Sequence, residues 1–146
     1  MPANKTAAPR HRLLIVDDEE SMRLLVARFL TKDMKVEAQL AGTCEQALRL
    51  ARNYAYDAIL LDLQMPGIGG FEVLKEIRAG SVNLTTPIMI ISVLADQRTN
   101  DRCIAAGADG FLVKPVERRA LVYAVKALLA ARGKAKPGAS NPKEDG

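Results

Sequence analysis

The stretch AILLDLQMPG, residues 58–67, contains the feature that decides the fold, an uninterrupted apolar run that ends in an aspartate. Such a run predicts a short strand that is buried on both faces, with Asp62 at its carboxyl end. The stretch LLIVDD, residues 13–18, has the same design, because its apolar run ends in Asp17 and Asp18. Two strands therefore present three carboxylates at what we expect to be one edge of a sheet.

Short apolar strands and amphipathic helices alternate along the rest of the chain. Strands are predicted at 13–16, 36–40, 58–61, 88–91 and 110–113, and helices at 20–32, 43–54, 71–80, 101–106 and 117–132. This alternation is typical of parallel strands joined by right-handed helical crossovers. We therefore predict an α/β fold, a five-stranded parallel doubly wound sheet of flavodoxin-like order 2-1-3-4-5 with helices on both faces. Ligands of such sheets bind at the carboxyl ends of strands 1 and 3, where the three acids lie.

Length and charge limit the classes of protein that fit. The chain has 146 residues, 49% of them hydrophobic, which suits one domain at residues 12–132. We expect a disordered basic N-terminal tail at 1–11 and a flexible C-terminal tail or linker at 133–146. The net charge of +4 belongs to the tails, because residues 13–132 carry 15 basic and 15 acidic residues. We therefore expect no direct nucleic acid binding.

Several kinds of site and location are disfavoured by what the sequence contains. Cys44 and Cys103 lie far apart without metal-site spacing, so we predict reduced thiols in helices. The single histidine, His11, precedes the first strand and cannot complete a histidine metal site or a Ser/His/Asp triad. No apolar run reaches the length of a membrane span, and the N-terminus does not resemble a secretory signal. We expect a cytoplasmic protein that does not associate with membranes.

The side chains at the strand ends predict phosphate chemistry with magnesium. Three neighbouring carboxylates repel one another, and oxygen ligands without histidine or cysteine favour a hard cation such as Mg²⁺. Ser92 and Lys114 follow two further strands at the same edge, where they can stabilise a phosphoryl group. A cis Lys114–Pro115 bond would direct the lysine into the crevice. Taken singly, these residues also fit a helix start, a helix cap and a turn; together they favour a site.

An ordered set of motifs resembles the receiver domain of two-component response regulators over residues 12–132. The motifs are VDDE at 16–19, LDLQMP at 61–66, Ser92, GADGF at 107–111 and Lys114-Pro115. The resemblance implies that Asp62 accepts a phosphoryl group from a phosphohistidine and becomes an aspartyl phosphate. It implies that Asp18 and Asp62 bind Mg²⁺ directly and Asp17 through water. The backbone carbonyl of Gln64 would be a further ligand.

The resemblance also implies a phosphorylation switch. Lys114 would pair with the phosphoryl group, and Ser92 would move to hydrogen-bond it. Phe111 stands where the family has an aromatic residue that turns inward when this hydroxyl is drawn to the phosphate. The switch would shift a population between two packings of the helix at 101–106, the following strand and the last helix.

One position departs from the common family pattern. The family often has a small residue after the hydroxyl residue of strand 4, whereas this chain has the larger Val93. The resemblance implies that Gln64 and Leu94 flank the route of the hydrolytic water. We therefore expect slower self-dephosphorylation than with a small residue at position 93.

The implied partners are a sensor histidine kinase or histidine phosphotransfer protein, and a downstream effector protein or domain. A phosphorylation-dependent dimer is a further implied assembly. The implied chemistry is self-phosphorylation and autodephosphorylation only, so we expect no enzyme acting on a separate substrate. We favour a stand-alone receiver. The alternatives are a receiver fragment of a longer regulator, with an effector domain after residue 146, and a non-phosphorylated interaction module.

Two other classes of protein fit less well. A phosphatase of the haloacid dehalogenase type needs a second acid two residues after the nucleophile, where this chain has Gln64. A flavodoxin-like cofactor carrier needs a phosphate-binding loop after the first strand. The acids that follow this strand would repel phosphate in the absence of a metal.

Overall fold

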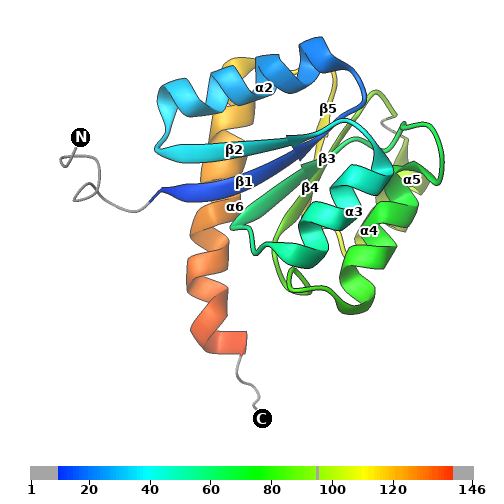
Figure 1. Ribbon diagram of the computed structural model, residues 1–146. Helices are drawn as coiled ribbons and strands as arrows, with labels where there is room; N and C mark the ends of the chain where they lie inside the picture. Colours follow the sequence, from blue (N-terminus) through cyan, green and yellow to red (C-terminus); the bar gives the residue numbers. More distant parts are fainter. Residues whose placement is uncertain (1–9, 95, 140–146) are drawn as a thin grey trace.

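Strands and helices alternate along the computed structural model, which describes residues 10–94 and 96–139 (Figure 1). The strands are β1 (His11–Val16), β2 (Val36–Ala41), β3 (Ala58–Leu61), β4 (Ile88–Ser92) and β5 (Gly110–Val113). The helices are α2 (Glu20–Asp33), α3 (Cys44–Asn53), α4 (Gly69–Gly80), α5 (Gln97–Ala105) and α6 (Arg118–Ala139). Every predicted strand and helix is present in the structure.

The strands form one parallel sheet in the order β2-β1-β3-β4-β5, which confirms the predicted fold. The chain winds outward in one direction from β1 to β2 and in the other from β3 to β5, so the winding reverses between β1 and β3. In the register of these two strands, Val16 pairs with Leu61. The residues that follow, Asp17 and Asp62, therefore leave neighbouring strands side by side, and the Asp62 N–H bonds to the Val16 carbonyl at 3.0 Å.

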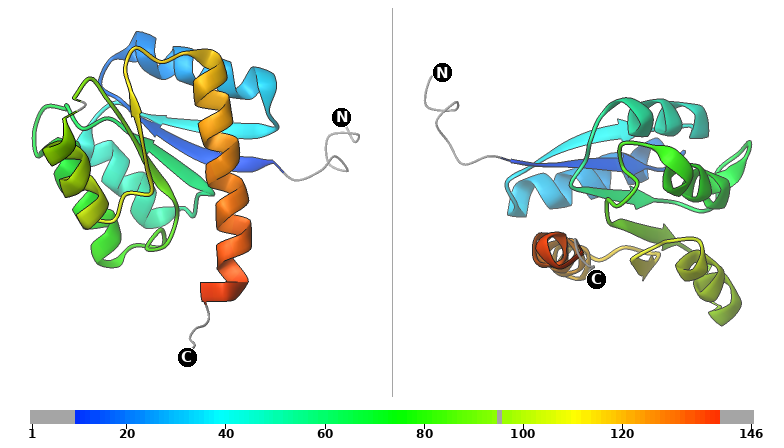
Figure 2. Two further views of the ribbon diagram at one scale, coloured as in Figure 1. Left: turned by 180° about the vertical axis from the view of Figure 1, so that it is seen from behind. Right: turned by 90° about the horizontal axis from the view of Figure 1, so that it is seen from below.

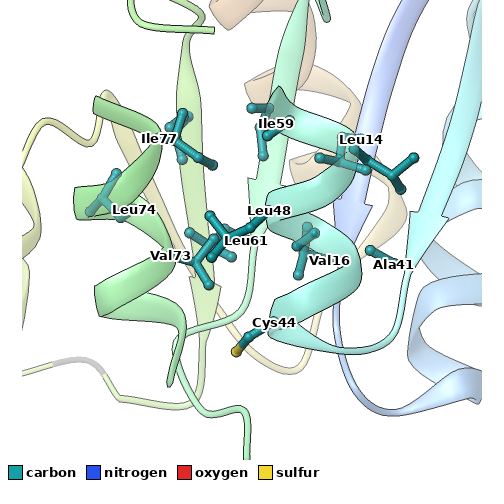
Figure 3. Close-up of a cluster of buried hydrophobic side chains, with 14 of the residues drawn as sticks. Leu14, Val16, Ala41, Cys44, Leu48, Ile59, Leu61, Val73, Leu74 and Ile77 are labelled. Atoms are coloured by element: carbon teal, nitrogen blue, oxygen red, sulfur yellow. The ribbon is translucent and has the colours of Figure 1, made fainter. Parts of the chain in front are cut away.

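Helices cover both faces of the sheet and enclose two apolar clusters. Helices α2 and α6 lie against one face, and α3, α4 and α5 against the other (Figures 1 and 2). Alternate residues of the same strand enter opposite clusters, as Leu13 and Leu14 do. Figure 3 shows Leu14, Ile59 and Leu61 of the sheet packed against α3 and α4. Burial on both faces explains why the central strands are continuously apolar.

Local capping confirms one predicted helix start and corrects another. Thr43 accepts a hydrogen bond from the Gln46 N–H at 3.0 Å and so caps the helix that was predicted at 43–54. Helix α5 begins at Gln97, earlier than the predicted start at Asp101, because the Asp96 side chain accepts from the Thr99 N–H at 3.0 Å. The first turn of α5 lacks an apolar stripe, so the hydrophobic pattern did not indicate it.

The two ends of the domain also differ from the prediction. Strand β1 begins at His11, inside the predicted N-terminal tail, because the His11 N–H bonds to the Lys35 carbonyl at 3.2 Å. Helix α6 continues beyond the predicted end at Arg132 to Ala139. The prediction ended the helix before Gly133 and Pro137 because both residue types have low helix propensity. The rest of the two predicted tails, 1–9 and 140–146, lies outside the described residues.

Two further predictions concern the thiols and the membrane. Cys44 and Cys103 are free and buried in α3 and α5, which confirms the predicted reduced thiols in helices. Among the helices of the described residues, none combines the length and the apolarity that crossing a membrane requires.

Candidate functional site

Strands β1 and β3 bring the three predicted acids together at the carboxyl edge of the sheet. One carboxylate oxygen from each of Asp17, Asp18 and Asp62 lies within 4.8 Å of the other two. Asp17 and Asp62 are buried, with 5% and 4% of their surface exposed, whereas Asp18 is exposed. The side chains of Asp17 and Asp62 accept hydrogen bonds from backbone N–H groups two residues onward, Glu19 N at 2.9 Å and Gln64 N at 3.1 Å. The loops after both strands thus orient the acids.

Lys114 lies between the two buried acids. Its Nζ is 3.0 Å from Asp17 Oδ2 and 3.3 Å from Asp62 Oδ2. The Lys114–Pro115 peptide bond is cis, as predicted. The Lys114 N–H also bonds to the Ser92 carbonyl at 2.9 Å, which aligns the end of β5 with the end of β4. A positively charged side chain therefore lies between the two buried carboxylates.

Burial and charge shift the protonation of Asp62 and Lys114. Burial raises the pKa of Asp62, and the charge of Asp17 adds to this effect. The bond from Gln64 and the charge of Lys114 lower the pKa only in part. Burial alone would lower the pKa of Lys114, but its hydrogen bond to Asp17 and the charges of Asp62 and Asp17 raise it. The repulsion between carboxylates that the sequence indicated is present as the charge of Asp17, but burial is the larger cause of the raised pKa of Asp62.

The remaining predicted residues lie at or just after the carboxyl end of β4, or on β5. Ser92 is fully buried, and its hydroxyl oxygen accepts from the Leu94 N–H at 3.2 Å. Val93 and Leu94 follow at the surface, with exposed fractions of 57% and 38%. Phe111 is partly buried and packs against the cluster that α3, α4 and α5 cover. Ser92 and Lys114 thus lie at the same sheet edge as the acids, and Phe111 lies on the strand that carries Lys114.

Two residues at this edge were not predicted as parts of the site. Gly70 leaves no space for a side chain, because a Cβ there would overlap the main-chain carbonyl of Asp62. Arg23 donates from Nη1 to the main-chain carbonyl of Asp17 at 2.7 Å. The Gly69-Gly70 pair was a visible signal for a close backbone approach. Arg23 gave no such signal, because its contact depends on how α2 packs beside β1.

The acids fit a hard divalent cation. Their oxygens converge within 4.8 Å, and oxygen is the donor that Mg²⁺ prefers. Mg²⁺ is usually held by one or two carboxylates and keeps several waters, which suits a cluster of two buried acids and one exposed acid. The predicted role of the Gln64 carbonyl stays a prediction. What is observed of Gln64 is its exposed position after Asp62 and the bond that its N–H makes to the Asp62 carboxylate.

Comparison with known proteins identifies the family. The family model described as "Response regulator receiver domain" matches residues 13–126, most of the chain. The chain is 35% identical over 118 residues to the transcriptional regulatory protein ResD of Bacillus subtilis (strain 168). The match covers 81% of this chain and 48% of ResD, so the chain corresponds to about half of that relative.

Solved structures agree with this assignment. The chemotaxis protein CheY4 of Vibrio cholerae is 30% identical, with a TM-score of 0.78, over 82% of this chain and 99% of the other. The receiver domain of the sensor histidine kinase PA1611 from Pseudomonas aeruginosa PAO1, solved with a magnesium ion in its active site cleft, is 27% identical. Its TM-score is 0.76, with coverage of 84% of this chain and 99% of the other. Together with the sheet order and the acidic edge, these matches show that the chain belongs to the receiver domain family of two-component response regulators.

Proposed function

We propose that this receiver is a phosphoacceptor that takes a phosphoryl group on Asp62 in the presence of Mg²⁺. The donor is a phosphohistidine of a sensor histidine kinase or of a histidine phosphotransfer protein. The observation that carries the proposal is the convergence of Asp17, Asp18 and Asp62 within 4.8 Å, with Lys114 bonded to two of them. A negatively charged group can approach these acids only if cations offset them, and Lys114 supplies one such charge.

The transfer is a displacement at phosphorus. A carboxylate oxygen of Asp62 attacks, a P–O bond forms, and the P–N bond to the donor imidazole breaks. The electron pair of that bond returns to the imidazole nitrogen, which then takes a proton. Asp62 must be ionised to attack, although its burial favours the protonated form. The charge of Lys114 offsets part of this effect and then pairs with the phosphoryl oxygens.

Magnesium would be held by Asp18 and Asp62 directly, by Asp17 through water and by the Gln64 carbonyl. When bound, it would supply the positive charge that offsets both the carboxylates and the phosphoryl oxygens. The PA1611 receiver domain, which is similar to this chain, was solved with magnesium in its cleft, and this supports the same ion here. Ser92, buried beside the site, would donate its hydroxyl hydrogen to a phosphoryl oxygen.

The output is a change of packing in α5, β5 and α6. Movement of the Ser92 hydroxyl toward the phosphate would open space into which Phe111 turns, which shifts the population between two arrangements. Exposed apolar side chains on each element support a protein-binding role for this surface, since Ile104, Val113 and Tyr123 have exposed fractions of 52%, 43% and 77%. A downstream effector, in a separate protein or a linked domain, or a second copy of the chain would bind there.

The rest of the proposal follows from the same chemistry. The chain acts in the cytoplasm, where histidine kinases transfer their phosphoryl groups. Its covalent chemistry is confined to its own aspartate, in self-phosphorylation and autodephosphorylation. The correspondence to about half of ResD supports an effector function that is coupled to the receiver. A receiver that acts only through its surface, without phosphorylation, is the alternative that the following experiment tests.

Intact mass spectrometry after incubation with a small acyl phosphate tests the proposal. With Mg²⁺, we expect the mass of one phosphoryl group to be added to the chain. We expect no addition with Asp62→Asn, or when a chelator removes the metal. A phosphohistidine donor replaces the acyl phosphate in a second series, because some receivers accept only from protein donors. No adduct in either series would contradict the proposal, and an adduct that persists in Asp62→Asn would place it on another residue.

A further inference from the structure

Arg23 reaches from the first turn of α2 back to the end of β1. Its Nη1 donates a 2.7 Å hydrogen bond to the main-chain carbonyl of Asp17, and its own N–H bonds to the Glu19 carbonyl at 3.0 Å. The side chain is only partly exposed. The guanidinium therefore ties the loop that carries the first two acids to the helix that follows it.

The peptide that Arg23 holds is the one that joins Asp17 to Asp18. Because a peptide unit is planar, a fixed Asp17 carbonyl also fixes the position of the Asp18 Cα, from which the carboxylate extends. Asp17 has other restraints, since its N–H bonds to Ala41 O at 3.1 Å and its carboxylate accepts from Glu19 N. Within residues 10–94 and 96–139, the carboxylate of Asp18 has no hydrogen-bond or ion-pair partner. The position of Asp18 in the acidic cluster thus depends on its backbone.

Gly42 provides the space in which the guanidinium lies. A Cβ at this position would lie 2.6 Å from Arg23 Nη1 and 3.1 Å from its Cζ, closer than side chains tolerate. The Gly42 N–H bonds to Gln46 Oε1 at 2.9 Å, which restrains the backbone on this side. The end of a long side chain moves more easily than a hydrogen-bonded loop. A side chain at position 42 would therefore displace Arg23.

We propose that Arg23, whose guanidinium lies against Gly42, is a positioning residue for the magnesium site. It acts by holding the peptide between Asp17 and Asp18 in place. The inference rests on the magnesium binding of the proposed function. Groups that orient metal ligands typically change metal affinity by about 10–100-fold when they are lost. The sign of the effect is diagnostic, because removal of a positive charge would by itself strengthen the binding of a cation.

Calorimetric titration of the full chain with Mg²⁺ tests this role. We expect Arg23→Ala and Gly42→Ala each to weaken binding about tenfold. The double variant should be no weaker than Arg23→Ala alone, because Gly42→Ala acts through Arg23. Arg28→Ala removes an exposed charge of the same helix and is the matched control, with an affinity within about twofold of the unmodified chain. Circular dichroism at the titration temperature confirms that each variant is folded.

Several outcomes would overturn the inference. Unchanged or tighter binding by Arg23→Ala would show that the hydrogen bond does not position the ligands. Multiplicative losses in the double variant would show that Gly42 acts independently of Arg23. If Arg23→Ala does not fold, Arg23→Met replaces it, because methionine keeps an unbranched stem without a hydrogen-bond donor, and an affinity equal to that of the unmodified chain would be equally contrary. If the unmodified chain itself binds no Mg²⁺, the proposed function fails together with this inference. If the unmodified chain binds Mg²⁺ and the variants bind it equally well, only the inference fails.

Discussion

Gly70 lies directly against the main-chain carbonyl of Asp62, so close that a methyl group at position 70 would overlap the carbonyl oxygen. The Gly70 N–H also bonds to the Leu63 carbonyl at 3.0 Å, which anchors the start of α4 on the loop that follows β3. The clash would be with backbone, so neither partner can move without shifting the loop. The backbone of the phosphoacceptor and the start of α4 thus fit together only through a glycine.

Gly70→Ala is therefore expected to impair both folding and phosphorylation. Overpacking of this kind costs about 1–3 kcal/mol of unfolding free energy. Displacement of the Asp62 backbone should also slow acyl phosphate labelling at least about tenfold. Chemical denaturation and labelling kinetics measure the two effects. Gly80→Ala is the matched control at the other end of α4, because a Cβ there meets nothing within 4 Å. Equal behaviour of the two variants would contradict the predicted clash.

Lys114→Gln is expected to separate metal binding from phosphoryl transfer. Lys114 Nζ lies 3.0 Å from Asp17 Oδ2 and 3.3 Å from Asp62 Oδ2. Its positive charge therefore repels a Mg²⁺ ion that binds the same carboxylates. Its removal should strengthen Mg²⁺ binding severalfold and slow phosphorylation at least about tenfold. In the absence of metal it should destabilise the fold by about 3 kcal/mol, because two buried acids lose their partner. Lys75→Gln, at an exposed lysine of α4, is the control. Weaker Mg²⁺ binding by Lys114→Gln would contradict this account.

The raised pKa of Asp62 makes its contribution to the stability of the metal-free chain fall as the pH rises. Burial raises its pKa in the folded state above the value of about 3.9 in an unfolded chain. The folded state therefore holds this proton more tightly. The stabilisation of the fold by this tighter proton binding is complete below the pKa of Asp62 in the unfolded state. It is lost as the pH rises through the pKa of Asp62 in the folded state. Asp62→Asn does not titrate.

The stability of Asp62→Asn relative to the unmodified chain should therefore grow with pH. We expect its advantage in unfolding free energy to be larger at about pH 7 than at about pH 3.5. Urea denaturation without metal, at several pH values, measures the difference. Magnesium should reduce the advantage at neutral pH, because it binds the ionised carboxylates of the unmodified chain. A difference that stays constant with pH would contradict the assigned shift.

The sequence predicted the sheet order and the acidic edge because both follow from local patterns. Apolar runs that end in Asp17 and Asp62 become adjacent whenever alternating strands and helices wind a parallel sheet. Contacts between distant segments could not be predicted in this way. The fit of Gly70 to Asp62 and the bond from Arg23 to Asp17 depend on the packing of helix against loop. The larger effect of burial on the pKa of Asp62 likewise requires the folded structure.

Val93→Ala is expected to shorten the lifetime of the phosphorylated form. Val93 directly follows Ser92 and is 57% exposed, and we expect its branched side chain to narrow the route by which water would reach the phosphoryl group. A smaller side chain should speed hydrolysis severalfold. The decay is measured by intact mass after removal of the phosphodonor. Val82→Ala is the matched control, because Val82 is similarly exposed, at 60%, in the loop between α4 and β4. Equal decay rates would count against a gating role for Val93.

Asn83→Ala is expected to destabilise the fold without a direct effect on the site. Asn83 is fully buried, and its side-chain oxygen accepts from the Tyr56 N–H at 2.8 Å and from the Thr86 hydroxyl at 2.9 Å. Its amide donates to the carbonyls of Ala51 and Tyr54 at 2.6 and 2.8 Å. Three of these bonds join the loop before β4 to the last turns of α3 and the segment that follows it, and the bond from Thr86 lies within the loop itself.

Alanine at position 83 would leave several buried groups unpaired, at about 1–3 kcal/mol for each. We expect a loss of at least about 3 kcal/mol in unfolding free energy by urea denaturation. Asn53→Ala removes an exposed amide that donates within its own helix, to the Arg49 carbonyl, and should cost less than about 1 kcal/mol. At a temperature where both variants are folded, acyl phosphate labelling of Asp62 should match the unmodified chain. Equal stabilities of the two variants would show that water replaces the lost bonds, and the loop would then not depend on Asn83.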